Sequence, residues 1–152
     1  MRKFEAGAGA PPPPSLGDLA GEIEARSASA ALTLIEGAGG LLVPVDEKND
    51  VADLAVLLAA PLLLVAKDGL GVLSHAMSAV ESATRRDLRI AAVVLTPAER
   101  RDASQIQNRE ILAARLDAPV LAFPHCKDVD VALADAAVAC GVLRVALGAG
   151  SK

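Results

Sequence analysis

The residues best suited to chemistry form one short segment, Glu36-Gly37-Ala38-Gly39-Gly40. This segment follows an apolar run, so its carboxylate would stand at the carboxyl end of a buried strand, where parallel sheets place their ligands. Glycines let the backbone approach a ligand closely and turn its amides toward an anion, and a carboxylate beside them can hold Mg²⁺. The segment predicts a loop for a metal ion and an anion, with an ordinary tight turn as the alternative.

The cysteines and histidines offer no comparable site. Cys126 and Cys140 show no CxxC or metal-ligand spacing, and His75 and His125 are the only histidines. A structural zinc site is therefore not expected, and both thiols are read as reduced side chains in a cytoplasmic protein.

Composition indicates how the chain builds its core. Hydrophobic residues make up 53% of the 152 residues, but aromatic residues only 1%, so the core must consist of Leu, Val, Ile and Ala. That mixture favours a parallel sheet covered by helices. The net charge is −4, and Arg85-Arg86 and Arg100-Arg101 are isolated pairs that we interpret as solvated faces, so no nucleic-acid partner is expected. No apolar run is long enough to span a membrane.

Helical patterns alternate with short apolar runs along the chain. Ser15 is placed to cap the first helix, Asn49 or Asp50 the second, and Gly141 to stop the last. The expected helices cover residues 16–28, 51–59, 72–83, 102–116 and 129–139, and the expected strands cover 31–35, 62–66, 90–95 and 119–123. Alternation of this kind predicts an α/β fold of right-handed βαβ units, with a mostly parallel sheet flanked by helices.

The chain is expected to contain one domain. Residues 1–14 form a flexible proline-rich lead-in, for which a binding site for a proline-recognising domain is the alternative. Residues 15–147 form the α/β domain, and residues 148–152 a frayed tail.

Several segments in order resemble the dethiobiotin synthetase family, and the chain resembles the C-terminal portion of such an enzyme. The matching segments are Glu36–Gly40 with Pro44, then residues 51–55, 61–65, 69–76, 93–95 and 119–124. The resemblance implies a P-loop NTPase-like fold that is truncated before its P-loop, and a ligase that closes the ureido ring of dethiobiotin with ATP.

The resemblance also implies roles for individual residues. Glu36 matches the magnesium-binding acid of the family. Gly37, Ala38, Gly39 and Gly40 match the loop that lines the substrate and the transferred phosphate, and Gly69, Leu70, Gly71 and Ser74 match a loop that contacts diaminopelargonate across a homodimer interface. Ser74 stands where the family commonly has Asn, and His75 matches a helix-start position without a catalytic role.

Other family features do not occur in the sequence. No Gly-Lys-Ser or Gly-Lys-Thr is present, and none of the five lysines follows a glycine-rich turn between a strand and a helix. Thr96 occupies the place of an Asn that reads adenine in the family, which makes it a weak nucleotide-binding candidate. ATP and Mg²⁺ are therefore expected as cofactors only if another chain supplies a P-loop.

The P-loop strand of the family lies inside the sheet, beside the strand that ends in the acidic residue. Without it, the strands at residues 31–35 and 62–66 would close up, or a strand of another chain would fill the position.

Three hypotheses remain open for the function of the chain. The chain is one half of a split enzyme, with a P-loop-bearing partner; or a non-catalytic, dimerising or partner-binding pseudoenzyme scaffold; or part of a longer synthetase.

Overall fold

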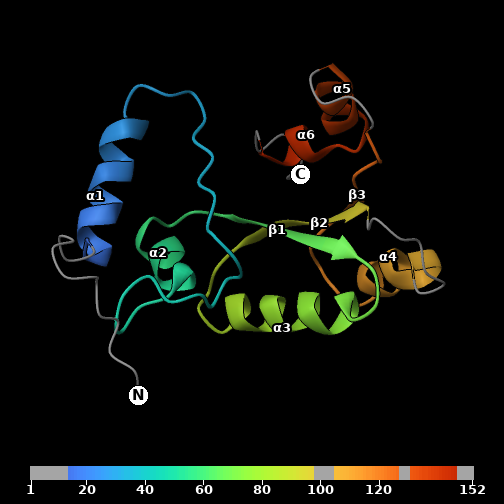
Figure 1. Ribbon diagram of the computed structural model, residues 1–152, viewed down its shortest axis with the longest axis horizontal. Coiled ribbons are helices and arrows are strands. Elements are labelled where there is room, and N and C mark those ends of the chain that lie inside the picture. The colour runs from blue at the N-terminus through green and yellow to red at the C-terminus, as the bar shows by residue number, and fades with distance from the viewer. Residues whose placement is uncertain (1–13, 98–104, 127–130, 147–152) are drawn as a thin grey trace, which may run out of the picture. The chain divides into compact units, whose positions relative to one another are not determined.

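The computed structural model describes residues 14–97, 105–126 and 131–146 of the chain (Figure 1). These residues belong to two compact units, residues 1–60 and residues 61–152, which are taken in turn below. Residues 1–13 of the predicted lead-in (1–14), the predicted tail and the expected helix start at Asp102 lie outside the described residues. One α/β domain over residues 15–147 stays a prediction.

The first unit holds two short helices with matching N-terminal caps. In α1 (Leu16–Ser27), the Ser15 hydroxyl accepts from the backbone of Asp18, whose carboxylate accepts from the backbone of Ser15 in return. In α2 (Val51–Leu57), Asp50 and Asp53 make the same reciprocal pair. Each pair satisfies backbone donors that a helix start leaves without partners. The prediction that Ser15 caps the first helix is confirmed, and of the two candidates for the second it is Asp50.

The predicted strand at residues 31–35 is wrong. The structure places these residues outside any β-strand, and Leu32, Leu34 and Ile35 are 43%, 72% and 46% exposed. An apolar run becomes a strand only when a neighbouring strand satisfies its backbone N–H and C=O groups. The strands of the described residues all lie beyond residue 61 and pair with one another, so this run has the composition of a strand without the pairing.

The second unit contains a parallel three-stranded sheet in the order β1-β2-β3. Its strands are β1 (Leu62–Asp68), β2 (Ile90–Pro97) and β3 (Val120–Ala122), and its helices are α3 (Val72–Thr84), α4 (Gln105–Ala113), α5 (Val131–Ala139) and α6 (Val142–Ala146). Because the strand order follows the chain, right-handed crossovers bring α3 and α4 to one face of the sheet, and α6 lies on the other (Figure 1). The predicted α/β fold with a parallel sheet is confirmed.

The core of this unit lies between the sheet and the helices α3 and α4. Val93 and Leu95 of β2 and Leu112 of α4 are almost completely buried, and they pack with Val72 and Ala76 of α3. The four central residues of β2 are all buried because helices cover both faces of this middle strand. The core is aliphatic, as the composition predicted.

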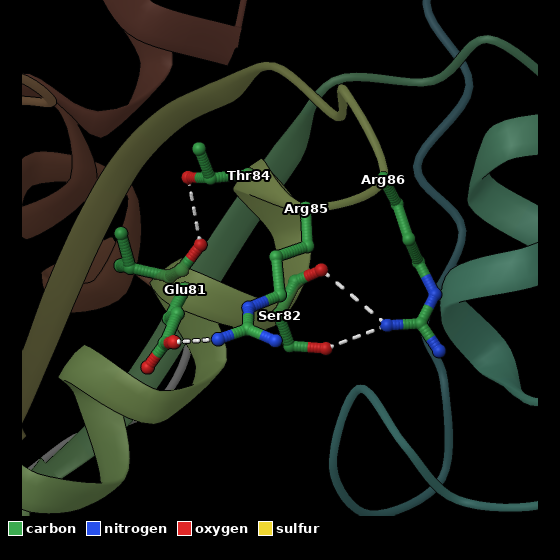
Figure 2. Close-up of polar contacts among 6 residues, drawn as sticks. Glu81, Ser82, Thr84, Arg85 and Arg86 are labelled. Atoms are coloured by element: carbon green, nitrogen blue, oxygen red, sulfur yellow. Dashed lines mark hydrogen bonds and ion pairs between the residues drawn. The ribbon is translucent and has the colours of Figure 1, made fainter.

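The arginine pair at the end of α3 bonds within its own helix (Figure 2). The Arg85 guanidinium forms an ion pair with Glu81, one turn earlier, and Arg86 donates to the side chain of Ser82 at 2.8 Å. The Thr84 hydroxyl donates to a main-chain carbonyl of the same helix at 2.9 Å. Basic side chains at a helix C-terminus stabilise its carbonyl end. The interpretation as a solvated face is confirmed for Arg85, Arg86 is half-buried, and Arg100-Arg101 lie outside the described residues.

Candidate functional site

The loop Glu36–Gly40 follows the segment at residues 31–35, and ten further residues separate it from α2. Its far end is held by hydrogen bonds from the amide of Val43 to the carbonyl of Gly40, at 3.1 Å, and from the amide of Ala52 to the carbonyl of Leu41, at 2.9 Å. The loop itself is exposed, and so is the Glu36 side chain. The carboxylate is therefore open to solvent and to a ligand.

Backbone angle and packing constrain two glycines of this loop to different degrees. A Cβ on Gly39 would lie 2.9 Å from a methyl group of Val43, and Gly39 has a φ of +88°, which residues with a side chain rarely adopt. A Cβ on Gly37 would lie 3.0 Å from a methyl group of Val51, whereas nothing lies within 4 Å of the same position on Gly40. The positive φ thus accounts for Gly39 and the close approach of Val51 for Gly37, whereas neither backbone angle nor packing explains Gly40.

A magnesium ion at Glu36 fits the residues present only in part. Among the described residues, no three His, Cys, Asp or Glu side chains gather in a way that could hold a metal ion. Mg²⁺ keeps several waters and is usually bound through one or two carboxylates together with phosphate oxygens. Glu36 could supply one such carboxylate, but the rest of the coordination would have to come from water and a bound phosphate.

The predicted substrate turn lies at the carboxyl end of β1. Gly71 has a φ of +90° and is the N-cap of α3, and the amide of Val72 donates to the carbonyl of Gly69 at 3.1 Å. Leu70, between the two glycines, is 90% exposed, and Ser74 lies exposed in the first turn of α3. The turn therefore presents backbone and an exposed apolar side chain to solvent. His75 lies beside it in the first turn of α3, as expected.

Thr96 lies near the carboxyl end of β2, opposite Lys67 of β1 in the register. Its hydroxyl is 3.4 Å from the carbonyl oxygen of Ala66, to which it donates. The side chain thus has a partner on the neighbouring strand, and it offers no amide that could pair with a nucleobase.

Sequence reasoning missed a polar cluster formed by Asp68, Gln105 and Asn108. The side-chain amide of Asn108 donates to the carboxylate of Asp68 at 2.8 Å, and that of Gln105 donates to the main-chain carbonyl of Asp68 at 2.7 Å. Asn108 is the buried polar residue of the described chain, at 3% exposed. The available signal was its position one turn before Leu112, which places an amide on the apolar face of α4.

The candidate residues are divided between the two units. Glu36 and the loop that follows it belong to the first, and the second holds Asp68, the turn Gly69–Gly71 and Thr96. Within the second unit, Asp68 and Thr96 lie at the carboxyl ends of adjacent parallel strands, with Asp68 opposite Pro97. This edge is where parallel α/β sheets place their ligands.

None of the helices in the described ranges combines the length and the apolar composition that a membrane span needs.

Comparison with known proteins identifies relatives of the chain. Residues 17–130 match a family described as an AAA domain. The ATP-dependent dethiobiotin synthetase BioD of Anaeromyxobacter sp. strain Fw109-5 is 36% identical over 117 residues, which cover 76% of this chain and 52% of that protein. The enzymes of the same name from Haloferax mediterranei and Anaeromyxobacter dehalogenans strain 2CP-C are 38% and 48% identical, over 60% and 51% of this chain and 39% and 36% of their own length. The chain spans about half the length of these relatives or less.

Proposed function

Since the chain belongs to the AAA domain family and is homologous to the dethiobiotin synthetases, we propose that it is a dethiobiotin synthetase-like protein of biotin biosynthesis. In this proposal the chain is inactive by itself and closes the ureido ring of diaminopelargonate only with a P-loop from outside these 152 residues. It works as a homodimer in the cytoplasm, with Mg²⁺ and ATP as cofactors of the complemented protein.

The observation that carries the proposal is the 36% identity over 117 residues to an ATP-dependent dethiobiotin synthetase. The loop at Glu36 supports it, because the carboxylate is exposed beside a backbone that can approach a ligand closely. The exposed turn at Gly69–Gly71 supports it too, because it lies at the carboxyl edge of the parallel sheet.

The chain's own residues suit some steps of that reaction better than others. Glu36 would hold Mg²⁺ through one carboxylate, and the backbone of Gly37–Gly40 would line the substrate. The turn Gly69–Gly71 with Ser74 would bind diaminopelargonate, and the short hydroxyl of Ser74 reaches less far than an Asn would. ATP would supply the phosphate that activates the carbamate, but the sequence contains no Gly-Lys-Ser or Gly-Lys-Thr to hold it.

The test is calorimetric titration of the purified chain with Mg·ATP and then with diaminopelargonate, together with its mass in solution. We expect diaminopelargonate to bind to a dimer and Mg·ATP not to bind. Adding the part of the Anaeromyxobacter enzyme that this chain does not match should then produce ATP-dependent dethiobiotin formation. Binding of neither ligand, with no turnover in the mixture, would rule the proposal out.

Matched variants test whether Glu36 itself is needed for turnover, or whether the loss of any exposed acidic side chain has the same effect. Glu36→Gln should abolish turnover in the complemented mixture, because it removes the metal-binding charge at constant size. Glu47→Gln removes the same charge from another exposed glutamate of the first unit and should leave turnover unchanged. Equal turnover in the two variants would remove Glu36 from the site.

A non-catalytic scaffold that dimerises or binds a partner is the second candidate function. The observation that favours it is Thr96, whose hydroxyl donates to the neighbouring strand and which offers no amide donor and acceptor pair for adenine. The positive φ of Gly39 and the packing of Val51 against Gly37 also account for these two glycines without a ligand. In this case Glu36→Ala would leave the cellular role of the protein unchanged, and growth of a strain carrying that variant without added biotin would distinguish the two candidates.

A further inference from the structure

The turn Gly69–Gly71 is tied to α4, a helix that begins more than thirty residues later in the chain. Asn108 donates to the Asp68 carboxylate at 2.8 Å, and Gln105 donates to the Asp68 carbonyl at 2.7 Å. Asp68 is both the last residue of β1 and the residue before the turn. The two amides therefore hold the point from which the turn departs.

The sheet by itself cannot hold this point as firmly. Asp68 lies opposite Pro97, the last residue of β2, so the described pairing of β1 with β2 ends at this point. The amide of Gln105 supplies a donor at that place. Asn108 is 3% exposed and Asp68 is half-buried, so their charge-assisted hydrogen bond is partly shielded from water.

The helix that carries these amides is itself fixed in place. Leu112, one turn after Asn108, is completely buried in the core. Arg109 donates from its side chain to the carbonyl of Val120, the first residue of β3, at 3.3 Å. A rigidly docked helix can thus set the position of Asp68 and of the turn beyond it.

We propose that Asn108, acting through Asp68, is a positioning residue that holds the turn Gly69–Gly71 in the conformation that binds substrate. Gln105 adds a second hydrogen bond, from its side-chain amide to the main-chain carbonyl of Asp68. The role of the turn in binding diaminopelargonate rests on the proposed function. The tie between α4 and the turn rests on the hydrogen bonds alone, so the two can be tested separately.

Amide hydrogen exchange of the whole chain tests the tie without any ligand. Asn108→Ala and Asp68→Ala should each speed exchange at the amides of residues 69–72 about tenfold, because each removes a hydrogen bond to a charged group. The double variant should exchange no faster than either single one, since both changes break the same bond. Gln107→Ala, at an exposed position of α4, is the matched control and should change nothing.

A rescue pair of variants distinguishes the loss of this hydrogen bond from a general loss of packing. Asn108→Asp sets two carboxylates against each other and should speed exchange at the turn, and adding Asp68→Asn restores a donor and an acceptor and should slow it again. Additive effects of the alanine variants, no change at residues 69–72, or failure of this rescue would each overturn the proposal.

Titration with diaminopelargonate then tests the link to substrate. If the unaltered chain binds it, Asn108→Ala should raise the Kd about tenfold and leave the exchange of the core amides of β2 unchanged. An unchanged Kd would separate Asn108 from substrate binding and overturn its positioning role. If the unaltered chain does not bind diaminopelargonate, the proposed function fails, and so does the substrate role of the turn, while the exchange data still decide the tie.

Discussion

At the scale of single residues, backbone geometry separates neighbours that look alike in the sequence. Gly39 has a φ of +88°, and a side chain there would collide with Val43, but its neighbour Gly40 has open space around the same position. Asp46 and Asp50 are both acids near the start of α2, but Asp46 accepts hydrogen bonds inside a turn and Asp50 caps the helix. The two glycines should therefore differ in how substitution changes stability, and Asp46 should show a pKa set by its turn.

Gly39→Ala should lower the free energy of unfolding by about 1 to 3 kcal/mol, because alanine is strained at a left-handed backbone angle. Gly40→Ala is the matched control and should be close to neutral, since nothing lies within 4 Å of the added carbon. Urea unfolding of both variants measures the difference. Equal losses of stability would show that the loop does not keep this conformation in solution.

Asp46 should titrate below its ordinary pKa of 3.8, because the side-chain amide of Asn49 and the backbone N–H groups of Lys48 and Asn49 donate to its carboxylate. The direction of this pKa shift determines how the stability of the turn depends on pH. The lowered pKa stabilises the folded turn at pH values above 3.8, and this contribution is lost as the pH falls through the lowered value.

An NMR titration of the Asp46 carboxyl carbon measures that pKa. In Asn49→Ala the pKa should move up toward 3.8, because the largest cause of the shift is removed. The pKa of Asp18, lowered by its own hydrogen bonds with Ser15, should stay where it was and serves as the internal control. An Asp46 pKa that does not move would assign the shift to the backbone donors.

At the scale of elements, α4 does more than its weak sequence pattern suggests. One face of this helix supplies Leu112 to the core and Asn108 to the polar cluster at the end of β1. Its side chain Arg109 reaches the start of β3. The helix therefore fixes both the core and the carboxyl edge of the sheet.

Leu112→Ala should lower the free energy of unfolding by about 2 to 5 kcal/mol, because it leaves a cavity at a completely buried position. Glu110→Ala, at an exposed position of the same helix, should stay within about 0.5 kcal/mol of the original. Thermal and urea unfolding of the pair provide the measurement. A small effect of Leu112→Ala would mean that α4 is not docked on the sheet.

At the scale of the whole molecule, the sheet and its core belong entirely to residues 61–152. The first unit has two capped helices and a long exposed apolar segment, and it contributes no strand to the sheet among the described residues. The described strands and the core that packs on them therefore come from the second unit, and the loop at Glu36 belongs to the first.

A fragment of residues 61–152 should fold by itself, because its sheet hydrogen bonds and its core are self-contained. Circular dichroism should show helix and strand with a single cooperative unfolding transition, and amides of β2 should be protected from exchange. Residues 1–60 as a separate fragment should show little more than partial helix. A fragment 61–152 without cooperative unfolding would show that the sheet needs the first unit.

The sequence by itself determined most of the elements. Ser15 identified one helix start, and Asn49 or Asp50 identified a second to within one residue. Pro61 identified the boundary before β1, and the apolar runs at residues 62–66, 90–95 and 119–123 identified all three strands of the described sheet. These features act through near neighbours: a cap, a fixed φ or a short buried run has its effect within a few residues. The relation to dethiobiotin synthetases was also readable from the order of motifs.

Only the tertiary structure decided whether residues 31–35 form a strand and which side chain bonds to Asp68. The apolar run at 31–35 has the composition of a strand but no partner strand, and composition cannot report whether a partner is present. The tie from Asn108 to Asp68 spans 40 residues of chain, so no local pattern records it. In both cases the deciding hydrogen bonds depend on residues distant in sequence, which the folded chain alone brings together or leaves apart.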